Sequence, residues 1–277
     1  MRRMLLSMGA TALLAMFCGR AHAQDTVDPL VLKAVPRERV VSFVRAVTQL
    51  SPGGQVSQRH PKLCPLVVGA DAAANGYVRA RLRQVAGELG LSFENRACAP
   101  NILVVFSREP ETMLRQARER GKIRYDGLSP LKIDRFKEDP KAVRWLTWTT
   151  EIPVFGDMPG DAGGIVMSAP GSRIVQPVMS RLNHSLIVVD ARQADGMEIA
   201  ALADYVTMVA LADIRPNAAP VDATSILNLF VGGPEATRRL SSFDLAYLRA
   251  VYRLKTGRMV ADQLSALAGD MSDDLRH

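Results

Sequence analysis

Residues 199–212 read IAALADYVTMVALA, a segment of helical length that is apolar nearly all the way round. A helix with apolar residues on every side must be covered by other elements, so this segment predicts a central, buried helix. Asp204 and Thr207 stand three residues apart and therefore share one face of it. Buried polar groups need partners, at a cost of roughly 1–3 kcal/mol each when they lack them. The simplest interpretation gives Asp204 a helix end or an arginine as partner, and bonds the Thr207 hydroxyl to a backbone carbonyl.

Strand-like segments occur on both sides of the chain's middle and alternate with helical ones. Residues 60–121 run strand, helix, strand, helix, which is the order of a βαβ unit. We expect an α+β or α/β fold with a mixed sheet, on which the helix at 199–212 packs. The expected strands lie near residues 62–68, 101–106, 143–149 and 185–190, and further helices are expected at 36–50, 71–90, 110–121 and 241–252.

The first 23 residues have the anatomy of a cleavable secretory signal peptide. The chain opens with Met1-Arg2-Arg3, continues with an apolar run over Met4–Phe17, and reaches a small-x-small cleavage pattern at Ala21-His22-Ala23. The apolar run is shorter than the ~20 residues of a membrane-spanning helix, so an uncleaved anchor is the weaker alternative. The sequence therefore predicts a periplasmic or secreted protein with no transmembrane segment after cleavage.

The rest of the chain divides by composition into a tail with a first helix and one larger domain. We expect a tail and helix over 24–59, a single α/β domain over 60–270 with a long Gly/Pro-rich loop at 150–180, and a C-terminal tail over 271–277. The formal net charge is +7, and residues 1–23 carry three arginines and no acidic residue, leaving +4. This mild excess indicates solubility and attraction to anionic surfaces, and does not indicate nucleic-acid binding.

Two cysteines remain after residue 23, Cys64 and Cys98, each at the edge of a strand-like run. An even pair in an oxidising compartment favours a disulfide. A buried thiol pair or half of a metal site are the alternatives, but no second Cys or His lies at metal-ligand spacing. The predicted disulfide would tie the two strands of the βαβ unit together near their starts.

The buried helix and the sequence after it resemble zincin metallopeptidases, in particular exported bacterial zincin-like proteins of unknown function. In zincins a buried helix carries His-Glu-x-x-His, which supplies two zinc ligands and a general base. That pattern places Ala203 and Thr207 at the histidines and Asp204 at the glutamate. Downstream, Ser225–Phe230 and the capped segment Leu240–Tyr252 are similar to elements that follow the active-site helix in such proteins. The resemblance covers about residues 185–258 and implies a zincin-like C-terminal half.

The resemblance does not extend to the catalytic residues, because neither of the two zinc-binding histidines is present. The histidines after residue 23 are His60, His184 and His277, and none stands four residues from another. The sequence thus predicts no catalytic residues, no metal and no cofactor, and a degenerate, non-catalytic domain. The alternative is a metal-dependent hydrolase or peptidase with rearranged ligands, such as Asp204 with a distant His184. The sequence contains no Gly-x-Ser-x-Gly elbow, P-loop or Gly-x-Gly-x-x-Gly fingerprint that would indicate another enzyme class.

A binding surface is predicted where the long loop would meet the buried helix. The expected groove lies between Trp145 and Trp148 on the 143–149 strand, Arg173 in the loop, and the face of Asp204 and Thr207. A peptide could add there as a further strand. The expected partner is an envelope protein or a peptide. An envelope structural protein without a ligand is a third option, and the sequence leaves the oligomeric state open.

Overall fold

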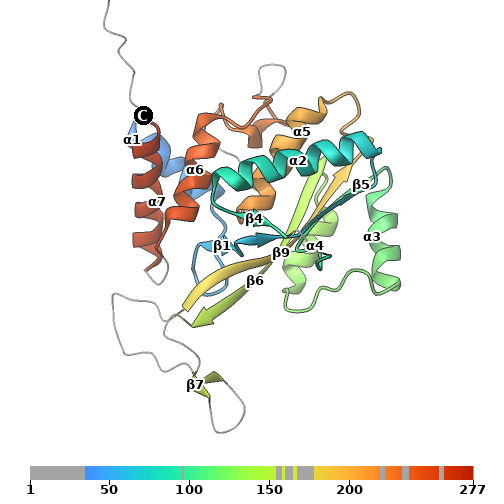
Figure 1. Cartoon of the computed structure of the whole chain (residues 1–277), viewed down its shortest axis with the longest axis horizontal. Helices are drawn as coiled ribbons and strands as arrows, with labels where there is room; N and C mark the ends of the chain where they lie inside the picture. Colours follow the sequence, from blue (N-terminus) through green and yellow to red (C-terminus); the bar gives the residue numbers. More distant parts are fainter. Residues whose placement is uncertain are drawn as a thin grey trace, which may run out of the picture. The chain divides into compact units, whose positions relative to one another are not determined.

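The computed structural model of the chain describes residues 35–94, 97–153, 158–159, 165–166, 178–218, 222–232, 237–255 and 259–276. Helices and strands are interspersed up to β9 (Val178–Asp190), and the elements that follow it in the described chain are helical (Figure 1). The helices are α1 (Arg37–Val47), α2 (Ala72–Glu88), α3 (Pro110–Glu119), α4 (Pro130–Glu138), α5 (Ile199–Leu211), α6 (Ser242–Arg253) and α7 (Val260–Asp274), with a 3-10 turn at Ile226–Asn228. The strands are β1 (Ser57–Arg59), β2 (Lys62–Leu63), β3 (Pro65–Val68), β4 (Ser92–Phe93), β5 (Ile102–Ser107), β6 (Val143–Pro153), β7 (Met158–Pro159), β8 (Ile165–Val166) and β9 (Val178–Asp190).

The main sheet is built around β9, the longest strand. On one edge β9 pairs in parallel with β1 through Ser180–Leu182 and with β5 through Ser185–Asp190. β3 lies beyond β5, also parallel, so β3, α2 and β5 form the predicted βαβ unit. Along the other edge β6 runs antiparallel to β9 over almost its whole length. The expected mixed sheet with strands from all four regions is confirmed, and β1 is a further strand that was not predicted.

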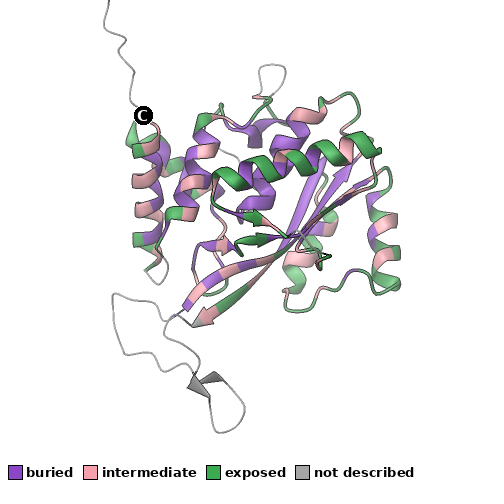
Figure 2. Ribbon diagram, in the orientation of Figure 1, coloured by how far each residue is buried: buried purple, intermediate pink, exposed green. Residues whose placement is uncertain are grey.

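Helices cover both faces of this sheet, with most of them on one side (Figure 1). The larger core joins the inward side chains of α1, α2, α5, α6 and α7 to one face, represented by Trp145 and Ile187. A smaller core joins α3 and α4 to the opposite face through Leu146 and Val188. Every residue of α5 from Ala201 to Leu211 is buried, whereas α2 exposes its outer side (Figure 2). The prediction of a covered central helix at 199–212 is confirmed.

Local capping chemistry explains where the predicted helices begin and end. The Asp71 side chain accepts a hydrogen bond from the Ala74 amide at the start of α2, and Gly90 just after it has a positive φ of 76°. At the start of α6, Ser241 and Asp244 form a reciprocal capping box. Both starts were expected from the sequence, and the capping box was expected as a variant of the motif.

The helices α4 and α7 were not predicted, and α7 occupies part of a predicted tail. α4 begins at Ser129, whose hydroxyl accepts from the Lys132 amide, with Pro130 at the first helical position. α7 extends to Asp274 and buries Leu267 and Met271 in the larger core. Residues 271–274 therefore belong to a packed helix and are not part of a C-terminal tail.

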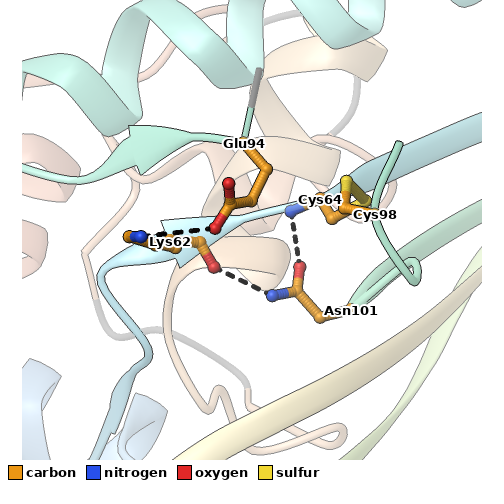
Figure 3. The surroundings of a disulfide bond; sticks show 5 residues. All are labelled: Lys62, Cys64, Glu94, Cys98 and Asn101. Atoms are coloured by element: carbon orange, nitrogen blue, oxygen red, sulfur yellow. Dashed lines mark hydrogen bonds and ion pairs between the residues drawn. A yellow bond between two sulfur atoms is a disulfide. The ribbon is translucent and has the colours of Figure 1, made fainter. Parts of the chain in front are cut away.

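The disulfide between Cys64 and Cys98 is present, with 6.1 Å between the two Cα atoms. It joins the residue before β3 to the segment that leads into β5, which is the predicted position. Figure 3 shows the side chain of Asn101 beside it: its Oδ1 accepts from the Cys64 amide at 2.8 Å, and its Nδ2 donates to the Lys62 carbonyl at 3.0 Å. The starts of the two parallel strands are thus held by one covalent and two hydrogen-bonded links.

The described residues from 35 onward form one compact unit, and the expected boundary between residues 59 and 60 falls inside it. The predicted signal peptide, and most of the predicted loop at 150–180, lie outside the described residues. None of the helices in the described ranges combines the length and apolar character needed to cross a membrane.

Candidate functional site

The outer edge of β6 carries backbone groups that no described strand pairs with. The Ser185 amide donates to the Asn101 carbonyl on the β5 side, so Ser185 turns its backbone groups away from β6. Its cross-strand partner Thr147 is therefore in a non-hydrogen-bonded pair, with N–H and C=O directed away from β9. The pairing of the two strands shifts register between Trp148 and Thr149, and the extra residue there, Asn183, belongs to β9. β6 itself has no extra residue, so its backbone directions continue to alternate, and Trp145 and Thr149 also present backbone groups to the outer edge.

A cleft of about 740 Å³ runs along this edge, and we call it the β6 cleft. One wall is α4, with Leu131, Lys132 and Arg135 among its lining residues. The other wall is the segment after α5, residues 213–217, together with residues 49–52. Arg135 and Arg215 are exposed, and neither forms an ion pair within the described part of the chain. The cleft therefore combines strand edge, apolar surface and unpaired positive charge.

Three residues from three elements form a hydrogen-bonded network in this cleft. The Lys132 ammonium donates to the Thr147 carbonyl at 2.6 Å and to the Thr147 hydroxyl at 3.1 Å. The Thr147 hydroxyl in turn donates to Oδ1 of Asp213 at 2.9 Å. Burial raises the pKa of the Asp213 carboxyl, while the nearby Lys132 charge and the Thr147 hydroxyl act in the opposite direction. Burial also lowers the pKa of Lys132, which the Asp213 charge partly counteracts.

Arg59 lies in the core behind this network and holds the end of α5. Its Nε donates to the Ala210 carbonyl at 2.7 Å, and its Nη2 donates to the Ser185 hydroxyl. The last carbonyls of a helix carry partial negative charge and have no partner within the helix, so a guanidinium there is stabilising. Burial lowers the pKa of Arg59 to about 10. Arg59 thus links β1, β9 and α5, and fixes the C-terminal end of α5 just before Asp213.

The two tryptophans of the predicted groove lie on opposite faces of the sheet. Trp145 is 4% exposed, packs edge-on against Tyr205 at 6.2 Å, and donates its indole N–H to the Ile214 carbonyl at 2.9 Å. Trp148 is half-buried against the smaller core and lines a separate hollow with His184. Arg173 lies outside the described residues. The structure therefore does not bring Trp145 and Trp148 together on one surface, and a binding role for any of these three residues stays a prediction.

Asp204 and Thr207 are both buried on α5. The Arg81 guanidinium of α2 donates to Oδ1 of Asp204, and the Leu240 amide donates to Oδ2 at 2.9 Å. The arginine partner expected for Asp204 is confirmed. The backbone acceptor expected for Thr207 is not: its hydroxyl has no hydrogen-bond partner in the described part of the chain. Ala203, at the other histidine position of the resemblance, is also fully buried.

Lys132 and Asp213 were not among the predicted site residues. A usable signal existed for Asp213, which is the first charged residue after the apolar helix. The sequence contains no such signal for Lys132, since a lysine in a short polar helix is ordinarily solvated. Their proximity depends on the pairing of β6 with β9, which local sequence does not specify.

Replacing Asp213 with asparagine is expected to stabilise the protein increasingly as pH rises. The folded pKa of Asp213 lies above its ordinary 3.8, so between these two values the folded state binds more protons than the unfolded one. The wild type therefore loses stability relative to Asp213→Asn as pH increases through this window. The amide oxygen of asparagine can still accept from Thr147.

Urea unfolding at several pH values between 3 and 8 measures this difference, with the exposed Asp195→Asn as the control for losing one negative charge. A wild type that gains stability relative to Asp213→Asn with rising pH would contradict the assignment.

No group of three or more His, Cys, Asp or Glu side chains suited to a metal ion occurs among the described residues. Both carboxylate oxygens of Asp204 are engaged as above, and His184 lines hollows beside Trp148 and Asn101. No family model, no curated protein and no solved structure matches this chain.

Proposed function

We propose that this protein is a non-catalytic binding module that takes an extended polypeptide segment along the outer edge of β6. The observation that carries the proposal is an antiparallel edge strand whose outward backbone groups open into the β6 cleft. Extended peptides bind such edges through main-chain hydrogen bonds, and neighbouring pockets select their side chains. The ligand would be a peptide or a segment of another protein.

The setting we propose is the periplasm or the exterior of the cell, after removal of residues 1–23. The signal-like N-terminus supports it, as does the Cys64–Cys98 disulfide, since such crosslinks persist in oxidising compartments. We further propose that residues 185–258 are a degenerate zincin-like region. What supports this is the order of the elements: β9 leads to the buried helix α5, then to the turn at Ile226–Asn228, then to the capped helix α6.

A proline at Thr149 tests the proposed function directly. Thr149 lines the β6 cleft and, by alternation along β6, directs its N–H outward, so proline there removes an edge donor without removing a bond to β9. We expect Thr149→Pro to weaken peptide binding about tenfold or more, the equivalent of one or two lost main-chain hydrogen bonds. The matched control is Thr149→Val, which keeps the β-branched shape and the N–H.

The probe is a pool of random decapeptides, enriched on the immobilised protein and identified by mass spectrometry. Affinities of the enriched sequences are then measured by fluorescence anisotropy, and circular dichroism verifies that each variant is folded. Equal binding to Thr149→Pro and Thr149→Val, or no enrichment at all, would rule out the β6 edge as a peptide site.

A further inference from the structure

Lys132 occupies the point on the β6 edge where a continuous added strand would need a free acceptor. Its ammonium donates to the Thr147 carbonyl, which is directed outward. A peptide strand that ran past Thr147 would have to displace this ammonium and leave a half-buried charge without its acceptors. Charged side chains on an exposed edge commonly prevent the addition of further strands. Lys132 therefore prevents an added strand from pairing with β6 beyond Thr147.

On the other side of Thr147, a segment of the protein's own chain lies beside the first part of β6. The Trp145 indole donates to the Ile214 carbonyl, and the Lys141 ammonium donates to the Pro216 carbonyl, so residues 214–217 are held beside the first part of β6. Toward the other end, the Ser51 hydroxyl donates to the Glu151 carboxylate at 3.2 Å. The open stretch of edge thus lies at Thr149, next to the occupied carbonyl of Thr147.

The charged groups around Lys132 favour the binding of an anion. An ammonium has three N–H donors, and in the described chain two of those of Lys132 are used, both by Thr147. Arg135, one helical turn along α4, and Arg215, across the cleft, are exposed cations without an ion pair. The anions nearby are less available: Asp213 is buried and bonded to the Thr147 hydroxyl, and Asp139 lies 3.8 Å from the Lys141 ammonium. Glu138 on α4 and Glu151 on β6 are exposed, and Glu151 accepts a hydrogen bond from the Ser51 hydroxyl.

We infer that the β6 cleft binds the carboxyl-terminal end of a peptide, running antiparallel to β6 and ending opposite Thr147. The peptide pairs with the backbone of Thr149, and its terminal carboxylate takes the third N–H of Lys132, with Arg135 and Arg215 beside it. This inference rests on the proposed function and specifies its ligand: a polypeptide that ends there with a free α-carboxylate, not an internal segment.

The test compares two forms of the same peptides. Pools of random hexapeptides, one with free carboxyl termini and one amidated, are enriched on the immobilised protein. The best sequences of each pool are resynthesised in both forms, and their dissociation constants are measured by fluorescence anisotropy. We expect the free acids to bind about tenfold or more tightly than the amides, as for one charge-assisted hydrogen bond.

Lys132→Met removes the charge while keeping the length of the side chain, and is expected to abolish the difference between acid and amide. Lys132→Arg is expected to retain it in part. The matched control is Lys137→Met on the same helix, where the ammonium lies 5.6 Å from the centre of the Tyr125 ring, outside the β6 cleft. Thermal unfolding shows whether each variant is folded.

The outcomes separate this inference from the proposed function. If acids and amides bind equally and both lose affinity in Thr149→Pro, the edge site stands and the terminal-carboxylate inference falls. The inference also falls if Lys132→Met keeps the preference for the free acid. If neither pool yields a peptide whose binding depends on Thr149, both proposals are overturned.

Discussion

Replacing Asp244 with alanine is expected to destabilise the protein by about 3 kcal/mol or more. Asp244 is fully buried, and its carboxylate accepts from the Ser225 hydroxyl at 2.6 Å, the Ile226 amide at 2.9 Å, and the amide and hydroxyl of Ser241 at 3.0 and 2.9 Å. Truncation would leave these donors without their acceptor, and those of Ser225 and Ile226 lie in the buried interior. The same carboxylate caps α6 and fixes the turn at Ile226–Asn228, so both would loosen together.

Asn is the informative second substitution at this position. Both carboxylate oxygens of Asp244 accept hydrogen bonds, so one side of an asparagine amide must turn an N–H₂ group toward a donor. Burial raises the pKa of Asp244, so losing the charge is favourable in itself, but it does not supply the missing acceptor. We therefore expect Asp244→Asn to be destabilising as well, by less than Asp244→Ala.

Urea unfolding followed by tryptophan fluorescence and by circular dichroism measures these effects, with the exposed Asp195→Ala as the control. An Asp244→Ala variant within about 0.5 kcal/mol of wild type, the range of an ordinary surface substitution, would show that this carboxylate does not hold α6 and the turn together.

The parts of the fold that local sequence predicted are those with a strong one-dimensional signal. The all-round apolarity of 199–212 predicts burial whatever its neighbours are, and the aliphatic runs of β5 and β9 have the same property. α4 lacks such a signal: in Pro130–Glu138 only Phe136 is buried, while Leu131 is exposed in the β6 cleft. α7 contains Gly269 and several polar residues, and its helix is stabilised by packing against α6 and against α1, which lies far away in the sequence.

The candidate site was harder to predict because it depends on register. Whether Thr147 turns its backbone toward β9 or away from it is decided by its pairing with Ser185, 38 residues later in the chain. A shift of one residue would reverse this and would move every side chain of β6 to the other face. The predicted groove placed Trp145 and Trp148 together, although a spacing of three puts two residues of a strand on opposite faces. The alternation of the strand already contained that information.

Removing the disulfide is the second large effect we expect, at about 3–4 kcal/mol. The two cysteines are 34 residues apart, and the loss of unfolded-state entropy on closing a loop of that length has this magnitude in the chain-entropy model. The crosslinked loop contains β3 and α2, and it ends where β5 enters the sheet beside β9. The double variant Cys64→Ala/Cys98→Ala should therefore unfold at lower urea concentration than wild type, with Trp145 and Trp148 as fluorescent reporters in β6.

The reductant dithiothreitol provides the matched control, since it should lower the unfolding midpoint of the wild type and leave the double variant unchanged. Asn101 allows a further distinction, because its amide bridges the Cys64 amide and the Lys62 carbonyl independently of the crosslink. If the disulfide acts mainly on the unfolded chain, Asn101→Ala should destabilise the reduced and oxidised proteins by similar amounts. A much larger effect of Asn101→Ala in the reduced protein would mean that the crosslink instead maintains the folded geometry at the start of β3. An unchanged midpoint in the double variant would contradict a stabilising role altogether.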